Sequence, residues 1–270
     1  MRRVSSMALA ITLVACGART SPGAGAQDAD APGDAPSADA APSADLVLWL
    51  AAPVAITSSS LVWLDQSVHH HDATQSAPSQ RPTPDGAGGL VFDGVDDHLA
   101  LAAGFEDFTR GMTAFVVARP AHTSPLHAPR FFDFARSYGT LADSILFVRF
   151  GAGDELFYQT YPGSAVGALV DAPGAVRDDQ WQVFSVVASG GAPSSLVTSR
   201  LYVNGVLVAT GKTNVPTVVT RSSNFIARSN LSGIDTYLKG TLHEIRIYGR
   251  PLGAAERGAI DAELRKSVGL

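Results

Sequence analysis

The sequence predicts an all-β sandwich of antiparallel strands, and three observations support this fold class. Hydrophobic residues make up 46% of the 270 residues, which is enough to bury a sizeable core. Only 17% of the residues are charged, and 26 glycines and 16 prolines suit a turn-rich chain better than a helical one. Short β-like runs recur at roughly the 8–12-residue spacing of sandwiches and barrels, with no alternation of strands and helices.

The expected strands lie between residue 45 and about residue 268, and Gly, Pro, Asn, Asp or Ser fills most of the gaps between them. In chain order the strands are 46–50, 61–64, 90–93, 99–102, 112–119, 130–135, 144–150, 155–161, 166–170, 181–188, 199–203, 206–210, 224–228 and 241–248. One helix is expected at 254–266, because Glu256 near its start and Arg265 near its end complement the helix dipole. Ile260 and Leu264 would form its buried stripe.

Local patterns add detail to three of these elements. Asn204-Gly205 suits the type I′ turn of a hairpin, because both residues tolerate a positive φ. The side chains that would then face one way are Leu201, Val203, Val206 and Val208. Alternation places Ile245 and Ile247 inward and Arg246 outward, with a bulge near the out-of-phase Leu242. Residues 92–99 are interpreted as a second tight hairpin, with Gly94 in the turn.

The beginning of the chain carries an export pattern. Arg2 and Arg3 precede a short apolar run, residues 7–15, and the single cysteine of the chain, Cys16, follows it. A helix needs about 20 residues to span a bilayer, so the run is interpreted as a processing signal. Leu13-Val14-Ala15-Cys16 resembles the lipobox of bacterial lipoproteins. The resemblance implies a signal peptide at 1–15 and a lipid on Cys16 that anchors the chain in a membrane.

Residues 17–44 contain no Val, Ile, Leu, Met, Phe, Trp or Tyr. Such a segment cannot bury enough apolar area to offset the entropy of ordering. We therefore expect 16–44 to be a disordered Ala/Pro/Asp/Gly-rich tether that begins at the lipidated cysteine, and 45–270 to be the folded domain. The expected product is an exported, membrane-anchored lipoprotein of the bacterial cell envelope, with the membrane leaflet left open.

Four segments of the domain stand out in order along the chain: 48–74, which includes Trp63-Leu64-Asp65-Gln66-Ser67, then 92–97, 201–205 and 240–257. Each is a weak signal alone, but the ordered set resembles the bacterial LamG-like group of laminin G-type domains. The resemblance implies a concanavalin A-like jelly roll, in which two antiparallel sheets pack face to face. It covers nearly all of 46–266, although 120–180 match only in strand spacing.

Two groups of side chains are candidate metal ligands. Asp93, Asp96 and Asp97 could bind Ca²⁺ through their carboxylates, and calcium sites occur in laminin G-type relatives. The alternative is that Asp and Gly are needed there for a tight turn. Residues 69–71 are consecutive histidines that could bind a transition metal, but neighbouring residues of a strand cannot all face one ion.

Catalysis is not expected. Glucan-hydrolysing relatives carry two glutamates and an aspartate in a pattern like Glu-x-Asp-x-x-Glu on one strand, and this chain has no such run. Asp154 and Glu155 are adjacent, so they would point to opposite faces of a strand. Glu244 shares a face with Arg246, which favours a surface ion pair over a proton-donating acid.

Aromatic side chains are the candidates for stacking on a sugar. Tyr138, Tyr158, Tyr161 and Trp181 could form a platform. Against this, Trp181 lies in an apolar run typical of the core, as do Trp49 and Trp63, and Tyr158 and Tyr161 would face opposite ways. No ligand site is assigned from the sequence.

The leading hypothesis is a non-catalytic recognition domain, held at a membrane, that binds glycan or protein. It rests on analogy of fold. One alternative is a structural envelope protein whose jelly roll mediates assembly, and another is a glycoside hydrolase of the same superfamily. A net charge of −5, with no cluster of Lys and Arg beyond Arg2-Arg3, argues against nucleic-acid binding.

Overall fold

The computed structural model describes residues 45–123, 127–231 and 237–270, which all belong to one compact unit of the chain, 32–270. The predicted signal peptide, Cys16 and the tether lie outside the described residues. Within the described ranges, no helix is both long and apolar enough to cross a membrane.

The described residues form 16 strands in one continuous sheet. The strands are β1 (Leu46–Ile56), β2 (Leu61–Asp65), β3 (Ala73–Gln75), β4 (Thr83–Pro84), β5 (Leu90–Asp93), β6 (Leu99–Leu101), β7 (Gly111–Pro120), β8 (Arg130–Ala135), β9 (Ile145–Phe150), β10 (Glu155–Thr160), β11 (Leu169–Ala172), β12 (Gln182–Ser189), β13 (Leu196–Val203), β14 (Val206–Asn214), β15 (Ser223–Ile226) and β16 (Lys239–Tyr248). The helices are α1 (Ala254–Ser267) and two 3₁₀ turns, η1 (Pro78–Gln80) and η2 (Ala152–Asp154).

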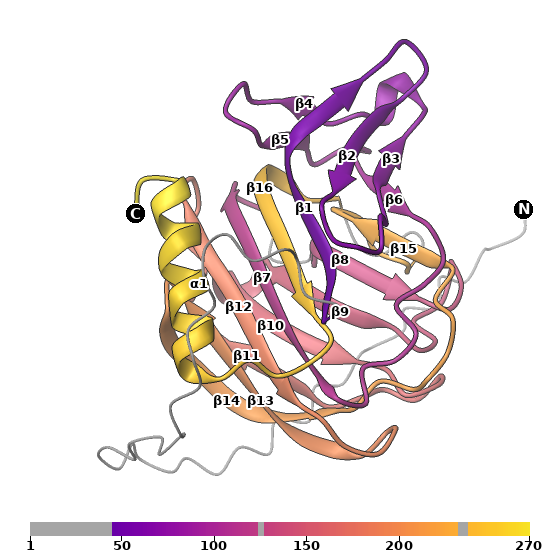
Figure 1. Cartoon of the computed structure of the whole chain (residues 1–270), viewed down its shortest axis with the longest axis vertical. Coiled ribbons are helices and arrows are strands. Elements are labelled where there is room, and N and C mark those ends of the chain that lie inside the picture. Colours follow the sequence, from indigo (N-terminus) through magenta and orange to yellow (C-terminus); the bar gives the residue numbers. More distant parts are fainter. Residues whose placement is uncertain (1–44, 124–126, 232–236) are drawn as a thin grey trace, which may run out of the picture. The chain divides into compact units, whose positions relative to one another are not determined.

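The sheet is antiparallel and folds over into two layers (Figure 1). Its strand order is β11-β10-β9-β8-β15-β6-β3-β2-β1-β16-β7-β12-β13-β14, with β5 beside β16 and β4 beside β5. In this order the first layer runs from β1 to β14, the second runs from β11 to β3, and β2 joins the two. The two ends of the order meet, because Asn214 of β14 accepts a hydrogen bond from Ala168 N and one from Thr160 Oγ1 of β10. The predicted all-β, concanavalin A-like jelly roll is confirmed.

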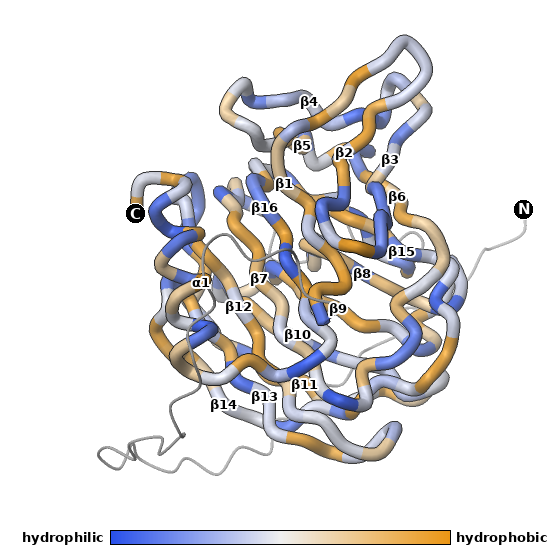
Figure 2. Tube along the Cα trace, in the orientation of Figure 1, coloured by the Kyte–Doolittle hydropathy of each residue, from blue (hydrophilic) through white to orange (hydrophobic). Residues whose placement is uncertain are grey.

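Side chains from both layers form the core between them. Hydrophobic residues recur along the strands of both layers (Figure 2). Phe131 of β8 stacks on Phe184 of β12, with ring centroids 5.1 Å apart. Ile245 and Ile247 of β16 point inward and are fully buried, as alternation predicted. Burial of each such side chain contributes about 1.5–3 kcal/mol, so this inter-layer core holds the sandwich together.

Helix α1 covers the outer face of β7 and β12 (Figure 1). Ile260 and Leu264, the predicted stripe, pack there with Phe115 and Val117 of β7. Arg246 faces outward on β16 as predicted, but it is only 8% exposed. The outer face of this layer and the side chains of α1 that pack on it therefore form a second, smaller core.

The hairpin between β13 and β14 confirms one prediction and corrects another. Asn204 and Gly205 both have positive φ, of 50° and 80°. The prediction that Leu201, Val203, Val206 and Val208 face one way holds for Val206, which pairs directly with Val203, but was wrong for Val208. A register shift after Leu201 places Ala209 opposite Leu201, so Val208 is left out of the pairing.

The predicted hairpin at 92–99 was also wrong. The turn exists, with Gly94 at φ 81° and Val95 N donating to Asp93 Oδ1. However, β5 pairs with β16 and β4, whereas β6 pairs with β15 and β3, so the turn carries the chain from one layer to the other. The bulge expected near Leu242 is present as a register shift between Leu242 and Glu244.

Candidate functional site

Five side chains gather on the solvent side of the second layer: His98, Tyr138, Phe225, Arg228 and Tyr237. We call them the Arg228 cluster. The guanidinium carbon of Arg228 lies 4.5 Å from the ring centroid of Phe225, 4.7 Å from that of Tyr138 and 5.9 Å from that of Tyr237. Cation–π attraction to several rings fixes the guanidinium in place.

Four separate segments build this cluster. Phe225 lies on β15, and His98 directly precedes β6, the neighbour of β15 in the sheet. Tyr138 follows β8, the other neighbour of β15, and Tyr237 lies just before β16. The His98 ring centroid is 5.8 Å from both the Phe225 and the Tyr237 centroids. The site therefore exists only after the second layer has formed.

The backbone at Ala227 aims Arg228 at the rings. Ile226 points into the core, so regular alternation would turn Ala227 out and Arg228 in. Instead Ala227 has φ 66° and is itself buried in the core beside Ile226. A left-handed conformation costs a non-glycine residue roughly 1–2 kcal/mol. This strained residue breaks the alternation and brings Arg228 out over Phe225.

One edge of the Arg228 guanidinium is hydrogen-bonded within the fold, and the other edge has no hydrogen-bond partner among the described residues. Nη1 donates to Nε2 of His98 over 3.0 Å, and Nδ1 of His98 lies 2.9 Å from the carbonyl oxygen of Asp96. This arrangement suits a neutral ring with its proton on Nδ1, and burial lowers the pKa of His98, which favours that neutral form. Within the described residues, Nε and Nη2 of Arg228 have no hydrogen-bond partner, and neither is among the polar atoms that are fully buried. The Nε–Nη2 edge thus faces solvent.

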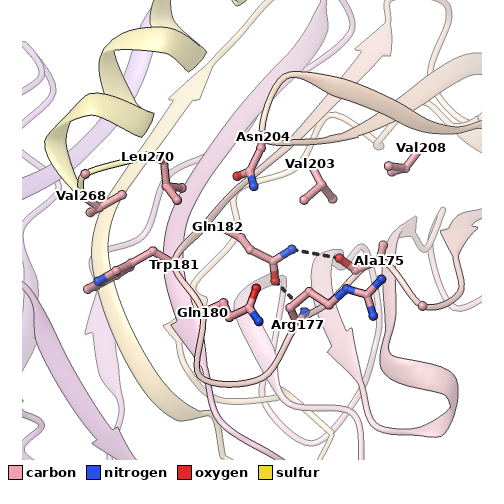
Figure 3. Close-up of a pocket in the computed structure, with 12 residues that line it drawn as sticks. Ala175, Arg177, Gln180, Trp181, Gln182, Val203, Asn204, Val208, Val268 and Leu270 are labelled. Carbon is pink, nitrogen blue, oxygen red and sulfur yellow. Dashed lines mark hydrogen bonds between the residues drawn. The ribbon is translucent and has the colours of Figure 1, made fainter.

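A shallow groove of about 690 Å³ lies between the β11–β12 connection, the β13–β14 hairpin and the residues after α1 (Figure 3). Two of the side-chain amides that line it, those of Gln182 and Asn204, form hydrogen bonds within the fold. The Gln182 side chain accepts from Arg177 N over 2.6 Å and donates to Ala175 O over 3.0 Å. Asn204 Oδ1 accepts from Val183 N. We therefore assign the groove a structural role and no ligand.

The predicted calcium ligands Asp93, Asp96 and Asp97 do come together. Their carboxylates each offer an oxygen, and these oxygens lie within 4.8 Å of one another. Asp93 Oδ1 accepts hydrogen bonds from Val95 N and Asp96 N, and Asp97 Oδ2 accepts one from Asp93 N. The alternative, that these aspartates are needed for a tight turn, therefore also accounts for Asp93 and Asp97. Burial, with added repulsion from Asp93 and Asp96, raises the pKa of Asp97. Oxygen ligands at this spacing suit Ca²⁺, and Ca²⁺ binding here stays a prediction.

Of the four aromatic residues predicted as a sugar platform, Tyr138 has the position that stacking requires, since it is 50% exposed. Tyr158 is fully buried and donates its hydroxyl to Met112 Sδ. Tyr161 packs at the edge of a small cluster with Leu146, and Trp181 is partly buried with its ring against His243. Sequence reasoning missed the partners of Tyr138, because they come from distant strands and share no local pattern.

The acidic residues weighed as catalytic do not converge on one site in the described contacts. Asp154 pairs with Arg149 over 2.9 Å. Burial, with repulsion from Asp171, raises the pKa of Glu155 to about 7. Glu244 accepts hydrogen bonds from Trp49 Nε1 and from Arg246. The predicted Glu244–Arg246 pair exists, but the prediction that it lies on the surface was wrong, because α1 and Trp49 cover it and both side chains are 9% exposed.

The 69–71 histidines lie in the loop after β2. The rings of His69 and His71 are parallel with centroids 5.8 Å apart, and His70 has φ 52°. This loop is organised by Asp65, whose carboxylate accepts from the backbone N–H groups of Trp49, Ser67 and His71. The Trp-Leu-Asp-Gln-Ser segment therefore has a structural role.

Comparisons with solved structures show the same fold at low sequence identity. The receptor-binding domain of botulinum neurotoxin type G superposes with a TM-score of 0.58 and 10% identity, covering 82% of this chain and 51% of that one. The binding domain of botulinum neurotoxin DC in complex with SialylT gives 0.57 and 10% over 82% and 52%. The sialidase of Trypanosoma rangeli gives 0.54 and 18% over 89% and 36%. The chain thus spans about half or less of these structures.

A comparison with curated proteins found no match. The family model Laminin_G_3, described as the concanavalin A-like lectin/glucanases superfamily, matches residues 93–256. This match spans β6 to the first turn of α1 and includes all five residues of the Arg228 cluster. The chain belongs to the concanavalin A-like lectin/glucanase superfamily.

Proposed function

We propose that residues 45–270 form a non-catalytic glycan-recognition domain, which a lipid on Cys16 holds at the membrane of a bacterial cell envelope. The Arg228 cluster is the observation that supports this best. The half-exposed ring of Tyr138 offers a face on which the C–H face of a sugar ring can stack, and the open edge of Arg228 offers hydrogen bonds beside it. An aromatic platform with adjacent donors is the arrangement that sugar recognition needs.

The solved structures of similar fold support the proposal by analogy of fold alone. One is named as a receptor-binding domain and another as a binding domain in complex with SialylT. A sialidase also shares the fold, so catalysis needs a separate test.

A glycan array probed with the purified full chain in detergent tests the binding proposal. Tyr138→Ala should lower the affinity for every bound glycan about tenfold, or ~1.4 kcal/mol. Tyr202→Ala is the matched control, because Tyr202 also lies against an arginine, Arg257 at 3.9 Å, but on β13. Absence of any glycan ligand, or equal losses in both variants, would contradict the proposal.

An assay of reducing ends tests the absence of catalysis. We expect no hydrolysis of laminarin, agarose, carrageenan or xylan. Glu155 is the acid to examine first, because a pKa of about 7 is what a general acid requires. Turnover that disappears in Glu155→Gln or in Glu244→Gln would show that the domain is a hydrolase.

Metabolic labelling with an alkyne fatty acid tests the anchor. The wild-type chain should take up the label and Cys16→Ser should not, because the cysteine sulfur is the expected attachment point. Equal labelling of the two chains would refute lipidation at Cys16.

An assembly role is the second candidate, and β14 is the observation that favours it. Val206, Leu207 and Val208 are 65%, 50% and 39% exposed at the hairpin end of the last strand in the sheet order. Exposed apolar side chains on an end strand favour self-association. Sedimentation velocity should show a monomer if recognition is the function, and a concentration-dependent oligomer abolished by Leu207→Asp would favour assembly.

A further inference from the structure

We propose that Arg228 is an anion subsite, so that the glycan bound at the Arg228 cluster is an acidic one whose carboxylate or sulfate contacts the Nε–Nη2 edge. The inference rests on the proposed function and adds the chemical class of the ligand.

The first argument is charge balance. Arg149, Arg246 and Arg250 are the partly or fully buried arginines that each contact two carboxylates. No ion pair among the described residues includes Arg228, although it is partly buried against aromatic rings. A cation taken partly out of water without a counter-ion is costly, and an anionic ligand would offset this cost.

The second argument is the direction of the open donors. His98 occupies Nη1, so Nε and Nη2 are the guanidinium donors that have no hydrogen-bond partner among the described residues. These two N–H groups are parallel and bind the two oxygens of a carboxylate or a sulfate together. Because His98, the rings and the strained Ala227 hold the fork in place, little side-chain entropy is lost when an anion binds.

The third argument is the neighbouring platform. The sugar ring can stack on Tyr138 while its acidic substituent reaches Arg228, whose guanidinium carbon is 4.7 Å from the Tyr138 centroid. Asp96 and Asp97 directly precede His98 on the segment leading into β6, and among the described residues neither forms an ion pair with Arg228. Because salt screens the attraction between Arg228 and an anion, we expect affinity to fall as salt is added.

The test is isothermal titration of the full chain in detergent with pairs of sugars that differ in one acidic group. The carboxylate pair is sialyllactose and lactose, and the sulfate pair is sulfated and unsulfated N-acetyllactosamine. The acidic member of at least one pair should bind about tenfold or more tighter than its neutral partner. Which pair shows the difference identifies the anion, and a difference in neither pair overturns the inference.

Variants separate charge from shape. Arg228→Met should remove the preference for the acidic sugar, and Arg228→Lys should keep part of it, because lysine retains the charge but not the two parallel donors. Arg257→Met is the control, since it removes an equal charge next to Tyr202 and Asp261 and should leave the preference unchanged. An unchanged preference in Arg228→Met overturns the inference.

Two further outcomes keep this inference distinct from the proposed function. If the wild type binds neutral sugars as well as acidic ones and Tyr138→Ala abolishes that binding, the recognition function stands and the anion subsite fails. Asp235 lies outside the described residues, so Asp235→Asn is measured as well. Acidic binding that appears only in Asp235→Asn would mean that the chain supplies its own anion, which also overturns the inference.

Discussion

Arg246 on the first layer and Arg228 on the second both lie against aromatic rings, and the two differ in what balances their charge. Arg246 is 4.7 Å from the Trp49 ring and contacts both Glu244 and Glu263. Arg228 lies against three rings, and among the described residues its hydrogen-bond partner is the neutral-favouring His98. The first arrangement is internally complete, whereas the second leaves a charge and two donors for something else. Whether an arginine that contacts aromatic rings is available to a ligand thus depends on whether carboxylates of the chain already neutralise it.

The pKa values follow the same contrast. Burial would lower the pKa of Arg246, but hydrogen bonds and charges from Glu263 and Glu244 outweigh it and raise the pKa. In the Arg228 cluster, burial lowers the pKa of His98, and the Arg228 charge acts in the same direction. The carboxylates lock Arg246 into the fold, while the neutral imidazole positions Arg228 without neutralising it.

The largest expected loss of stability comes from disrupting the contacts of Arg246 with Glu244 and Glu263. Glu244→Ala removes a buried acceptor from both Trp49 Nε1 and Arg246, and should lower the free energy of unfolding by about 3 kcal/mol. Glu263→Gln is the control on the same arginine, because Glu263 is 62% exposed and should cost about 1 kcal/mol or less. Urea unfolding measures the free energy of unfolding of both variants. Equal losses would mean that burial does not determine how much each carboxylate contributes to stability.

A second substitution, at Gly205, acts on the Arg246–Glu263 contact through α1. A side chain on Gly205 would place its Cβ 2.7 Å from Asp261 Oδ2, and φ there is 80°. Gly205→Val should therefore cost about 1–3 kcal/mol, and it should disturb the helix that carries Glu263. Asn204→Gly is the comparison, with a cost of about 1 kcal/mol for the lost bond to Val183 N. An unchanged Tm for Gly205→Val together with lost ligand binding would instead make the turn part of a binding site.

Removal of the Arg228 side chain should lower the free energy of unfolding only slightly. Arg228→Met loses cation–π contacts worth about 1 kcal/mol and no ion pair among the described residues. Arg246→Met, by contrast, leaves Glu244 buried without its cationic partner and should cost about 3 kcal/mol. Thermal unfolding of both variants checks the difference, and an equal drop in Tm would remove the distinction between the two clusters.

The smallest effect is a pH dependence confined to the Arg228 cluster. The pKa of His98 is lowered from its ordinary 6.5 in the folded state, so the folded chain binds this proton less readily than the unfolded chain does. Its contribution to stability is full above pH 6.5 and is lost as pH falls through the folded-state pKa. The stability difference between wild type and His98→Gln should shrink between pH 7.5 and pH 5. A difference that stays constant would show that His98 does not titrate there.

Sequence patterns predicted the strands and the helix because these depend on local periodicity. Expected and observed bounds agree for 130–135, and the helix at 254–266 ends one residue later, at Ser267. The missed strands β3 and β4 have three and two residues, too few for alternation to be visible. The wrong hairpin at 92–99 has the same turn chemistry as a hairpin, and only the pairing of β5 with β16 distinguishes them.

By itself, the sequence determined the all-β class, the order of the elements, the positive-φ turn at Asn204-Gly205 and the meeting of Asp93, Asp96 and Asp97. These features arise between residues that are close along the chain. The tertiary structure decided which arginine is neutralised and which is open, because Glu263 reaches Arg246 from α1 and the rings around Arg228 come from segments that meet only across β6, β15 and β8. Charge balance and ring contacts depend on distances in space, and a local pattern does not contain those distances.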